Sequence, residues 1–159
     1  MKMFGLFKKN KDDQEEKKEI TLDHPLMGRL TFNGFQWVGT FICQLFGSEK
    51  EIGLEIYLEN DKADDHLEKQ ETAYSYYAEN AEKINSKIES ELRYASEMED
   101  DIPLSSRFEP ACFIIFPYSS CGISFRDNEI DDEYNDAAYL VVSIRPRIIF
   151  KGCEHDYFG

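Results

Sequence analysis

The stretch LMGRLTFNGFQWVGTFICQLFG, residues 26–47, decides the fold of this chain. Asn33-Gly34 separates two β-rich runs, and this dipeptide supplies the positive φ angles that a two-residue hairpin turn requires. After the turn, one face carries Phe35, Trp37, Phe41, Cys43 and Leu45, and the other carries Gln36, Thr40 and Gln44. This period of two predicts a half-buried antiparallel strand. Gly39 interrupts the apolar face and indicates either a bulge or a close backbone approach.

The pattern continues beyond residue 47 into a third strand. Residues 47–51, GSEKE, are expected to form the next turn. In residues 52–58 the apolar side chains alternate again, with Ile52, Leu54, Ile56 and Leu58 on one face. Three strands joined by short turns predict an antiparallel meander.

The period changes from two to a helical one after residue 60. Apolar side chains form one stripe made of Leu67, Tyr74, Ala81, Ile88 and Ala95, with Tyr77, Ile84 and Leu92 between them. This stripe predicts a single amphipathic helix over roughly residues 64–96. Asp61, Asp64 and Asp65 suit its N-terminus as capping residues. We expect the Tyr-rich residues 74–77 to pack in the core and at its rim, because a base-stacking platform would need basic neighbours.

The second half of the chain contains short apolar runs. A polar loop at 97–110 precedes the predicted strands 111–116, 122–125, 137–144 and 147–150, the last being an edge strand or a continuation beyond Pro146. The predicted fold is therefore α+β: a largely antiparallel sheet, with a three-stranded N-terminal meander and three or four C-terminal strands. One long amphipathic helix packs on a face of that sheet. Residues 20–159 form a single domain, and residues 1–19 are a charged flexible tail.

The charge of the chain narrows the classes of partner. Its 159 residues hold 32 acidic and 18 basic side chains, which gives a formal net charge of −14. Such a field repels phosphate backbones and anionic lipids, so we expect no nucleic acid and favour a basic protein as partner. No run of 18 apolar residues predicts a membrane span. The four cysteines show no C-x-x-C spacing and no export signal accompanies them, which favours reduced thiols and a cytoplasmic location.

An acidic stretch at residues 125–142, FRDNEIDDEYNDAAYLVV, is the candidate site. A calcium-binding loop that began at Asp127 would need Gly at position 132 and a bidentate Glu at position 138. The chain has Asp132 and Ala138 there, so the stretch does not match this pattern. A catalytic carboxylate pair cannot be placed from sequence. We expect a solvated connection between two strands that binds a partner, since an aromatic anchor among charges is typical of interfaces. The candidate partner-binding residues are Asp127, Glu129, Asp131, Asp132, Glu133, Tyr134 and Asp136.

Other chemistry has weaker support in the sequence. Ser119, Ser120 and Cys121 fall in a predicted turn, but no G-x-S-x-G motif surrounds them. A thiol–imidazole pair would need the fold to bring Cys121 to His24 or His155. A zinc site that used Cys153 and His155 would lack the usual closely spaced ligand pairs. We therefore expect no catalytic residues, no metal and no cofactor.

Residues 24–59, HPLMGRLTFNGFQWVGTFICQLFGSEKEIGLEIYLE, resemble the opening of a group of small bacterial cytoplasmic domains of unknown function. Those domains begin with a similar hairpin and continue through a third strand into a helix. The resemblance continues to residue 159 through Gly122, Ile123, Phe125, Asp131, Glu133, Gly152 and Asp156. This chain departs from the pattern of those domains in two ways. It has no Trp or Cys where they carry one near the acidic motif, and Pro146 interrupts its last strand.

The resemblance implies that this chain is an immunity-type protein of a bacterial toxin system. It assigns no catalytic residue to the chain. We accordingly expect a non-enzymatic, acidic, cytoplasmic protein-binding domain that neutralises a basic, toxin-like protein. The alternatives are a housekeeping or scaffold domain whose acidity serves solubility, and a small hydrolase or metal-dependent enzyme.

Overall fold

The computed structural model describes residues 18–60, 62–64, 66–117 and 120–129, and the backbone of residues 139–144 and 148–151. Its strands are β1 (Ile20–His24), β2 (Gly28–Phe32), β3 (Gln36–Leu45), β4 (Ser48–Tyr57), β5 (Phe108–Phe116), β6 (Ser120–Asp127), β7 (Tyr139–Ile144) and β8 (Ile148–Lys151). Its helices are α1 (Glu68–Ser96) and a short 3-10 helix, η1 (Leu104–Ser106).

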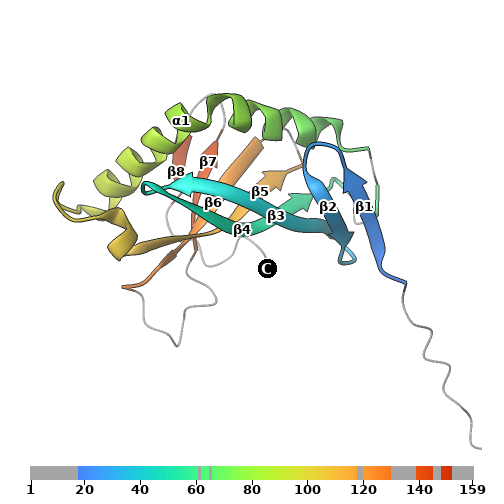
Figure 1. The fold of residues 1–159 in the computed structure, drawn as a ribbon, viewed down its shortest axis with the longest axis horizontal. Helices are drawn as coiled ribbons and strands as arrows, with labels where there is room; N and C mark the ends of the chain where they lie inside the picture. Colours follow the sequence, from blue (N-terminus) through green and yellow to red (C-terminus); the bar gives the residue numbers. More distant parts are fainter. Residues whose placement is uncertain are drawn as a thin grey trace, which may run out of the picture.

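All eight strands belong to one sheet and follow one another in chain order, with α1 lying along one side (Figure 1). Every neighbouring pair is antiparallel except β4 and β5, which are parallel. Parallel neighbours need a crossover connection, and α1 supplies it. The predicted α+β class, with a largely antiparallel sheet and one long helix, is confirmed. The N-terminal meander has one more strand than predicted, β1, and β8 is a separate edge strand antiparallel to β7.

The connection between β2 and β3 is longer than the predicted two-residue turn. Asn33, Gly34 and Phe35 lie between the two strands. The Asn33 side-chain oxygen stabilises this turn, because it accepts hydrogen bonds from the backbone N–H groups of Phe35 (3.3 Å) and Gln36 (3.1 Å). Gly34 takes the positive φ of 112° that the sequence predicted for this dipeptide. Phe35 was expected on the buried face of the strand, but it lies in the turn and is half exposed.

The turn between β3 and β4 consists of Phe46 and Gly47, not residues 47–51. Both have positive φ, 57° and 72°, as a two-residue type I′ turn requires. A phenylalanine is an unusual residue for this conformation. Its N–H donates to the Glu89 carboxylate of α1 at 2.8 Å, and its ring lies 6.0 Å from that of Phe125. These two contacts hold the turn against the helix and the sheet.

Gly39 marks a close approach, not a bulge. The register between β3 and β4 is unbroken on both sides of it. A Cβ atom there would lie 2.9 Å from Cδ2 of Leu30 and 3.1 Å from the carbonyl oxygen of Arg29. The missing side chain is therefore what allows β2 to pack against β3.

Helix α1 is continuous over 29 residues, although it starts later than predicted. Its N-cap residue is Leu67, with no side-chain capping bond. The predicted cap by Asp64 is wrong, because that carboxylate accepts from the backbone N–H of His66 at 2.9 Å. Asp61 and Asp65 lie outside the described residues. The buried face consists of Gln70, Ala73, Tyr77, Ile84, Asn85, Ile88 and Leu92.

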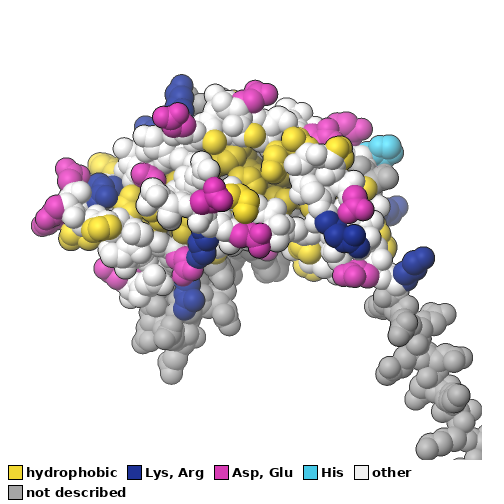
Figure 2. Space-filling model, in the orientation of Figure 1, with side chains coloured by type: hydrophobic (Ala, Val, Ile, Leu, Met, Phe, Trp, Pro, Cys, Tyr) yellow, Lys and Arg dark blue, Asp and Glu magenta, His cyan; other side chains and the backbone are white. Residues whose placement is uncertain are grey.

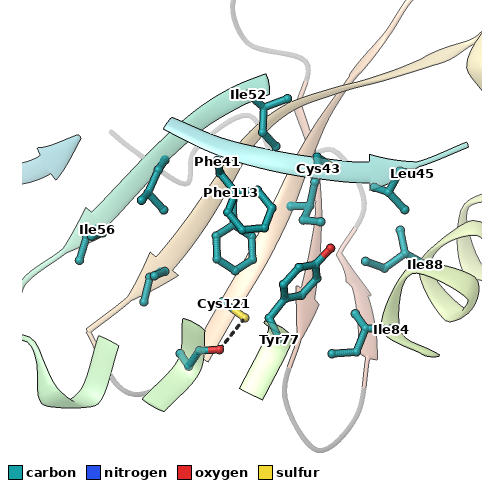
Figure 3. Close-up of a cluster of buried hydrophobic side chains, with 14 of the residues drawn as sticks. Phe41, Cys43, Leu45, Ile52, Ile56, Tyr77, Ile84, Ile88, Phe113 and Cys121 are labelled. Atoms are coloured by element: carbon teal, nitrogen blue, oxygen red, sulfur yellow. Dashed lines mark hydrogen bonds between the residues drawn. The ribbon is translucent and has the colours of Figure 1, made fainter. Parts of the chain in front are cut away.

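The core lies between α1 and the sheet, and aromatic rings fill its centre (Figure 3). Phe41 of β3 stacks on Phe113 of β5 with ring centroids 4.3 Å apart, and Tyr77 of α1 lies 5.5 Å and 5.0 Å from these two rings. The Tyr77 hydroxyl donates to the Asn85 side chain at 2.6 Å, whose amide donates to the Gln44 carbonyl at 2.8 Å. The expected packing role of the Tyr-rich segment is confirmed for Tyr77.

Candidate functional site

Asp127, the first residue of the predicted site, is not on the surface. It closes β6, and its side chain is 5% exposed. Arg107 donates to both carboxylate oxygens, from Nε at 3.0 Å and from Nη2 at 2.9 Å. This bond is the main cause that raises the pKa of the Arg107 guanidinium. A buried carboxylate needs such a partner, so Asp127 has a structural role and is not solvated as the sequence led us to expect, while its role in partner binding stays a prediction.

Glu129 is the one other predicted site residue within the described part of the chain. Its side chain is 67% exposed, and its carboxylate lies 3.2 Å from Nη1 of Arg107. Its backbone N–H donates to Oδ1 of Asp127 at 3.1 Å. The remaining predicted residues, Asp131, Asp132, Glu133, Tyr134 and Asp136, lie outside the described residues. The stretch does connect two neighbouring antiparallel strands, β6 and β7, as the sequence predicted.

A second acidic segment was not singled out from the sequence. It follows α1, and its exposed carboxylates are Glu97, Glu99, Asp100 and Asp101. Nη1 of Arg93 donates to the carbonyl oxygens of Glu99 (2.6 Å) and Ile102 (2.9 Å), which holds the segment against the helix end. The segment leads through η1 to Arg107, whose carbonyl oxygen accepts from the backbone N–H of Asn128 at 2.8 Å. Arg107 thus binds the start of the acidic stretch at Asp127, Asn128 and Glu129.

Exposed apolar side chains accompany these carboxylates. Tyr94 is 84% exposed and Ile102 is 42% exposed. A shallow groove between the end of α1 and the following segment is lined by Glu89, Ser90, Tyr94, Met98 and Leu104, among others. Figure 2 shows acidic and hydrophobic side chains together at the end of the molecule where α1 ends. We call the set Tyr94, Glu97, Met98, Glu99, Asp100, Asp101 and Ile102 the helix-end surface.

The thiols among the described residues are poor nucleophiles. Burial raises the pKa of Cys43 to about 11 and that of Cys112 and Cys121 to about 12, so all three are protonated near neutral pH. Ser120 and Cys121 lie in β6 and are buried, so the predicted turn does not include them. Ser119, Cys153 and His155 lie outside the described residues.

His24 does not pair with Cys121. Its Nδ1 accepts from the backbone N–H groups of Leu26 and Met27, both at 3.2 Å, so the proton lies on Nε2, which donates to Glu71 at 2.7 Å. The Cys121 thiol instead donates to the Ala73 carbonyl at 3.9 Å. Both groups therefore join the sheet to α1.

Neither a metal site nor a membrane span is found in the part of the chain that the structure describes. No three His, Cys, Asp or Glu side chains there are grouped to hold a metal ion. No helix there is long and apolar enough to cross a membrane. Comparisons with protein-family models, with curated proteins and with solved structures find no match for this chain.

Proposed function

We propose that this chain is a non-enzymatic, acidic protein-binding domain of the cytoplasm, and that it neutralises a basic protein such as a bacterial toxin. The net charge of −14 supports a basic partner, because a strong acidic field accelerates association with a positive surface. A nuclease toxin with a basic, phosphate-binding cleft would fit this requirement.

The observation that carries the proposal is the position of the two acidic segments. Arg107 forms ion pairs with Asp127 and Glu129, and its backbone carbonyl accepts a hydrogen bond from the N–H of Asn128. These contacts hold the start of the acidic stretch against Arg107, which ends the connection that contains the second acidic segment.

The test is capture of partners from the lysate of the source cell on the immobilised full chain, washed in parallel at low and at high salt. We expect one basic protein, bound in stoichiometric amount and released only at high salt. Charge reversal of Glu129 together with the acids at 131–136 should then slow association and leave the fold intact. A partner whose association rate is independent of salt would contradict the proposal. Absence of any basic partner would favour a scaffold role.

A further inference from the structure

We propose that the helix-end surface is the docking site for a Lys- or Arg-rich segment of the partner, and that the Tyr94 ring receives one of its cationic side chains. This inference rests on the proposed function and assigns it to a surface outside the acidic stretch at 125–142. Exposed cations bind aromatic faces, and a surround of carboxylates adds attraction for the same cation.

The carboxylates of the surface form no direct ion pair, although Arg93 lines the same groove and donates to the carbonyl oxygens of Glu99 and Ile102. Some carboxylates elsewhere have a basic partner within 4.0 Å, as Glu59 has Lys69 and Asp127 has Arg107. Among the described residues, no Lys, Arg or His forms an ion pair with the four carboxylates of the helix-end surface. A positive segment would therefore find this charge available without first breaking an existing pair.

The same residues are unfavourable for folding. Negative charge at the C-terminal end of a helix opposes the helix dipole, and these four carboxylates follow the last turn of α1. Glu97 also occupies the left-handed conformation, φ 54° and ψ 28°, that usually takes glycine after a helix. Side chains that oppose local stability and face solvent point to a role in binding.

The surface also has the form of an interface. Tyr94 stands on a continuous helix, so its position is fixed before a partner arrives. Arg93 ties the following segment to the same helix end, which places the carboxylates around the groove. Tyr94 and Ile102 give it exposed apolar area, and Met98 lines the groove beside them. An aromatic anchor with apolar neighbours and a charged rim is the usual composition of a protein-binding surface.

Two matched pairs of variants test the inference, with octa-arginine as the probe and the full chain as the protein. Tyr94→Ala is compared with Tyr76→Ala, an exposed tyrosine elsewhere on α1. The first should weaken binding about threefold, as expected for one exposed cation–π contact, and the second should leave it unchanged. A helix-end charge variant (E97Q, E99Q, D100N, D101N) is compared with a control of equal charge whose exposed acids lie far from that surface (E19Q, E68Q, E79Q, E82Q). Charges far from the docking site are screened over about 8 Å at physiological salt. The helix-end charge variant should therefore lose about tenfold in affinity for octa-arginine, and the control about twofold.

The outcomes separate this inference from the proposed function. Salt-sensitive binding with equal losses in the two charge variants would refute the helix-end surface and leave a basic partner in place. No salt-sensitive binding by the unsubstituted chain would refute both. Amide chemical shifts at residues 93–102 that vary with protein concentration, without probe, would assign the surface to a second copy and overturn the inference. Thermal unfolding checks the fold, and the helix-end charge variant should be at least as stable as the original chain.

Discussion

Replacing Asp127 by Asn tests the division between structural and partner-binding acids. The substitution keeps the size of the side chain and removes its charge, so Arg107 loses a bidentate carboxylate bound at 3.0 Å and 2.9 Å. Removing one partner of a buried ion pair costs about 3–5 kcal/mol of unfolding free energy. Arg107 is 23% exposed and retains Glu129 at 3.2 Å. We therefore expect a smaller loss, about 2 kcal/mol.

Urea denaturation measures this loss through the fluorescence of Trp37, the single tryptophan, which is buried. A loss of about 2 kcal/mol corresponds to a melting temperature lower by about 4–8 °C for a domain of this size. The matched control is Glu129→Gln, which removes an exposed charge and should change the unfolding free energy by less than about 0.5 kcal/mol.

The binding assays complete the comparison. Asp127→Asn should leave the affinity of the folded protein for a basic partner unchanged, since its carboxylate does not reach the surface. Two results together would refute the reasoning. Asp127→Asn would change the unfolding free energy by less than about 0.5 kcal/mol, as expected for a surface ion pair, and it would weaken binding more than Glu129→Gln does. Asp127 would then belong to the partner-binding set that the sequence first suggested.

Three further predictions concern the core and its edges. Gly39→Ala should cost about 1–3 kcal/mol by urea denaturation, because the new methyl meets neighbouring atoms at 2.9 and 3.1 Å. Gly53→Ala, with its nearest atom at 3.4 Å, should cost less than Gly39→Ala, and equal losses would contradict this explanation. Glu89→Ala should cost about 1 kcal/mol and speed hydrogen exchange at the Phe46 amide, whereas Glu89→Gln should restore much of the protection. The buried thiols of Cys43 and Cys121 and the half-buried thiol of Cys112 should resist iodoacetamide at pH 8 in a Cys153→Ser background and react in urea. Their pKa values are raised above the unfolded value of 9.0, so the folded state holds protons that the unfolded state releases. Unfolding free energy should therefore fall as pH rises from 9 toward 12, and a rise would refute the assignment.

Local patterns in the sequence were sufficient for most of the fold. The alternation in residues 36–45 and the apolar stripe of α1 each depend on near neighbours, and both elements form, although α1 begins later than predicted. β1 was missed because its five residues, ITLDH, alternate weakly and follow a charged run. Its pairing depends on a turn that the His24 side chain holds through two backbone N–H groups. Sequence spacing alone does not show such a bond.

The candidate site was harder to predict because it depends on contacts between distant residues. The pair of Arg107 and Asp127 spans 20 residues, and nothing in the sequence of the acidic stretch marks Asp127 as a carboxylate that is buried. A usable signal existed for Tyr94, which is a large aromatic residue outside the apolar stripe of the helix. An aromatic side chain on the polar face of a confidently predicted helix indicates an exposed anchor.

The acidic side chains differ in what they contribute, and this difference directs attention to the end of α1. Asp127, Glu71 and Glu89 each bind a donor from a distant segment, so they stabilise the packing of that segment. The carboxylates of the helix-end surface bind no described cation, oppose the helix dipole and include Glu97 in a strained conformation. Under the proposed function, binding of a positive partner offsets these costs, because the same charges that repel one another in the free protein become favourable when the partner neutralises them.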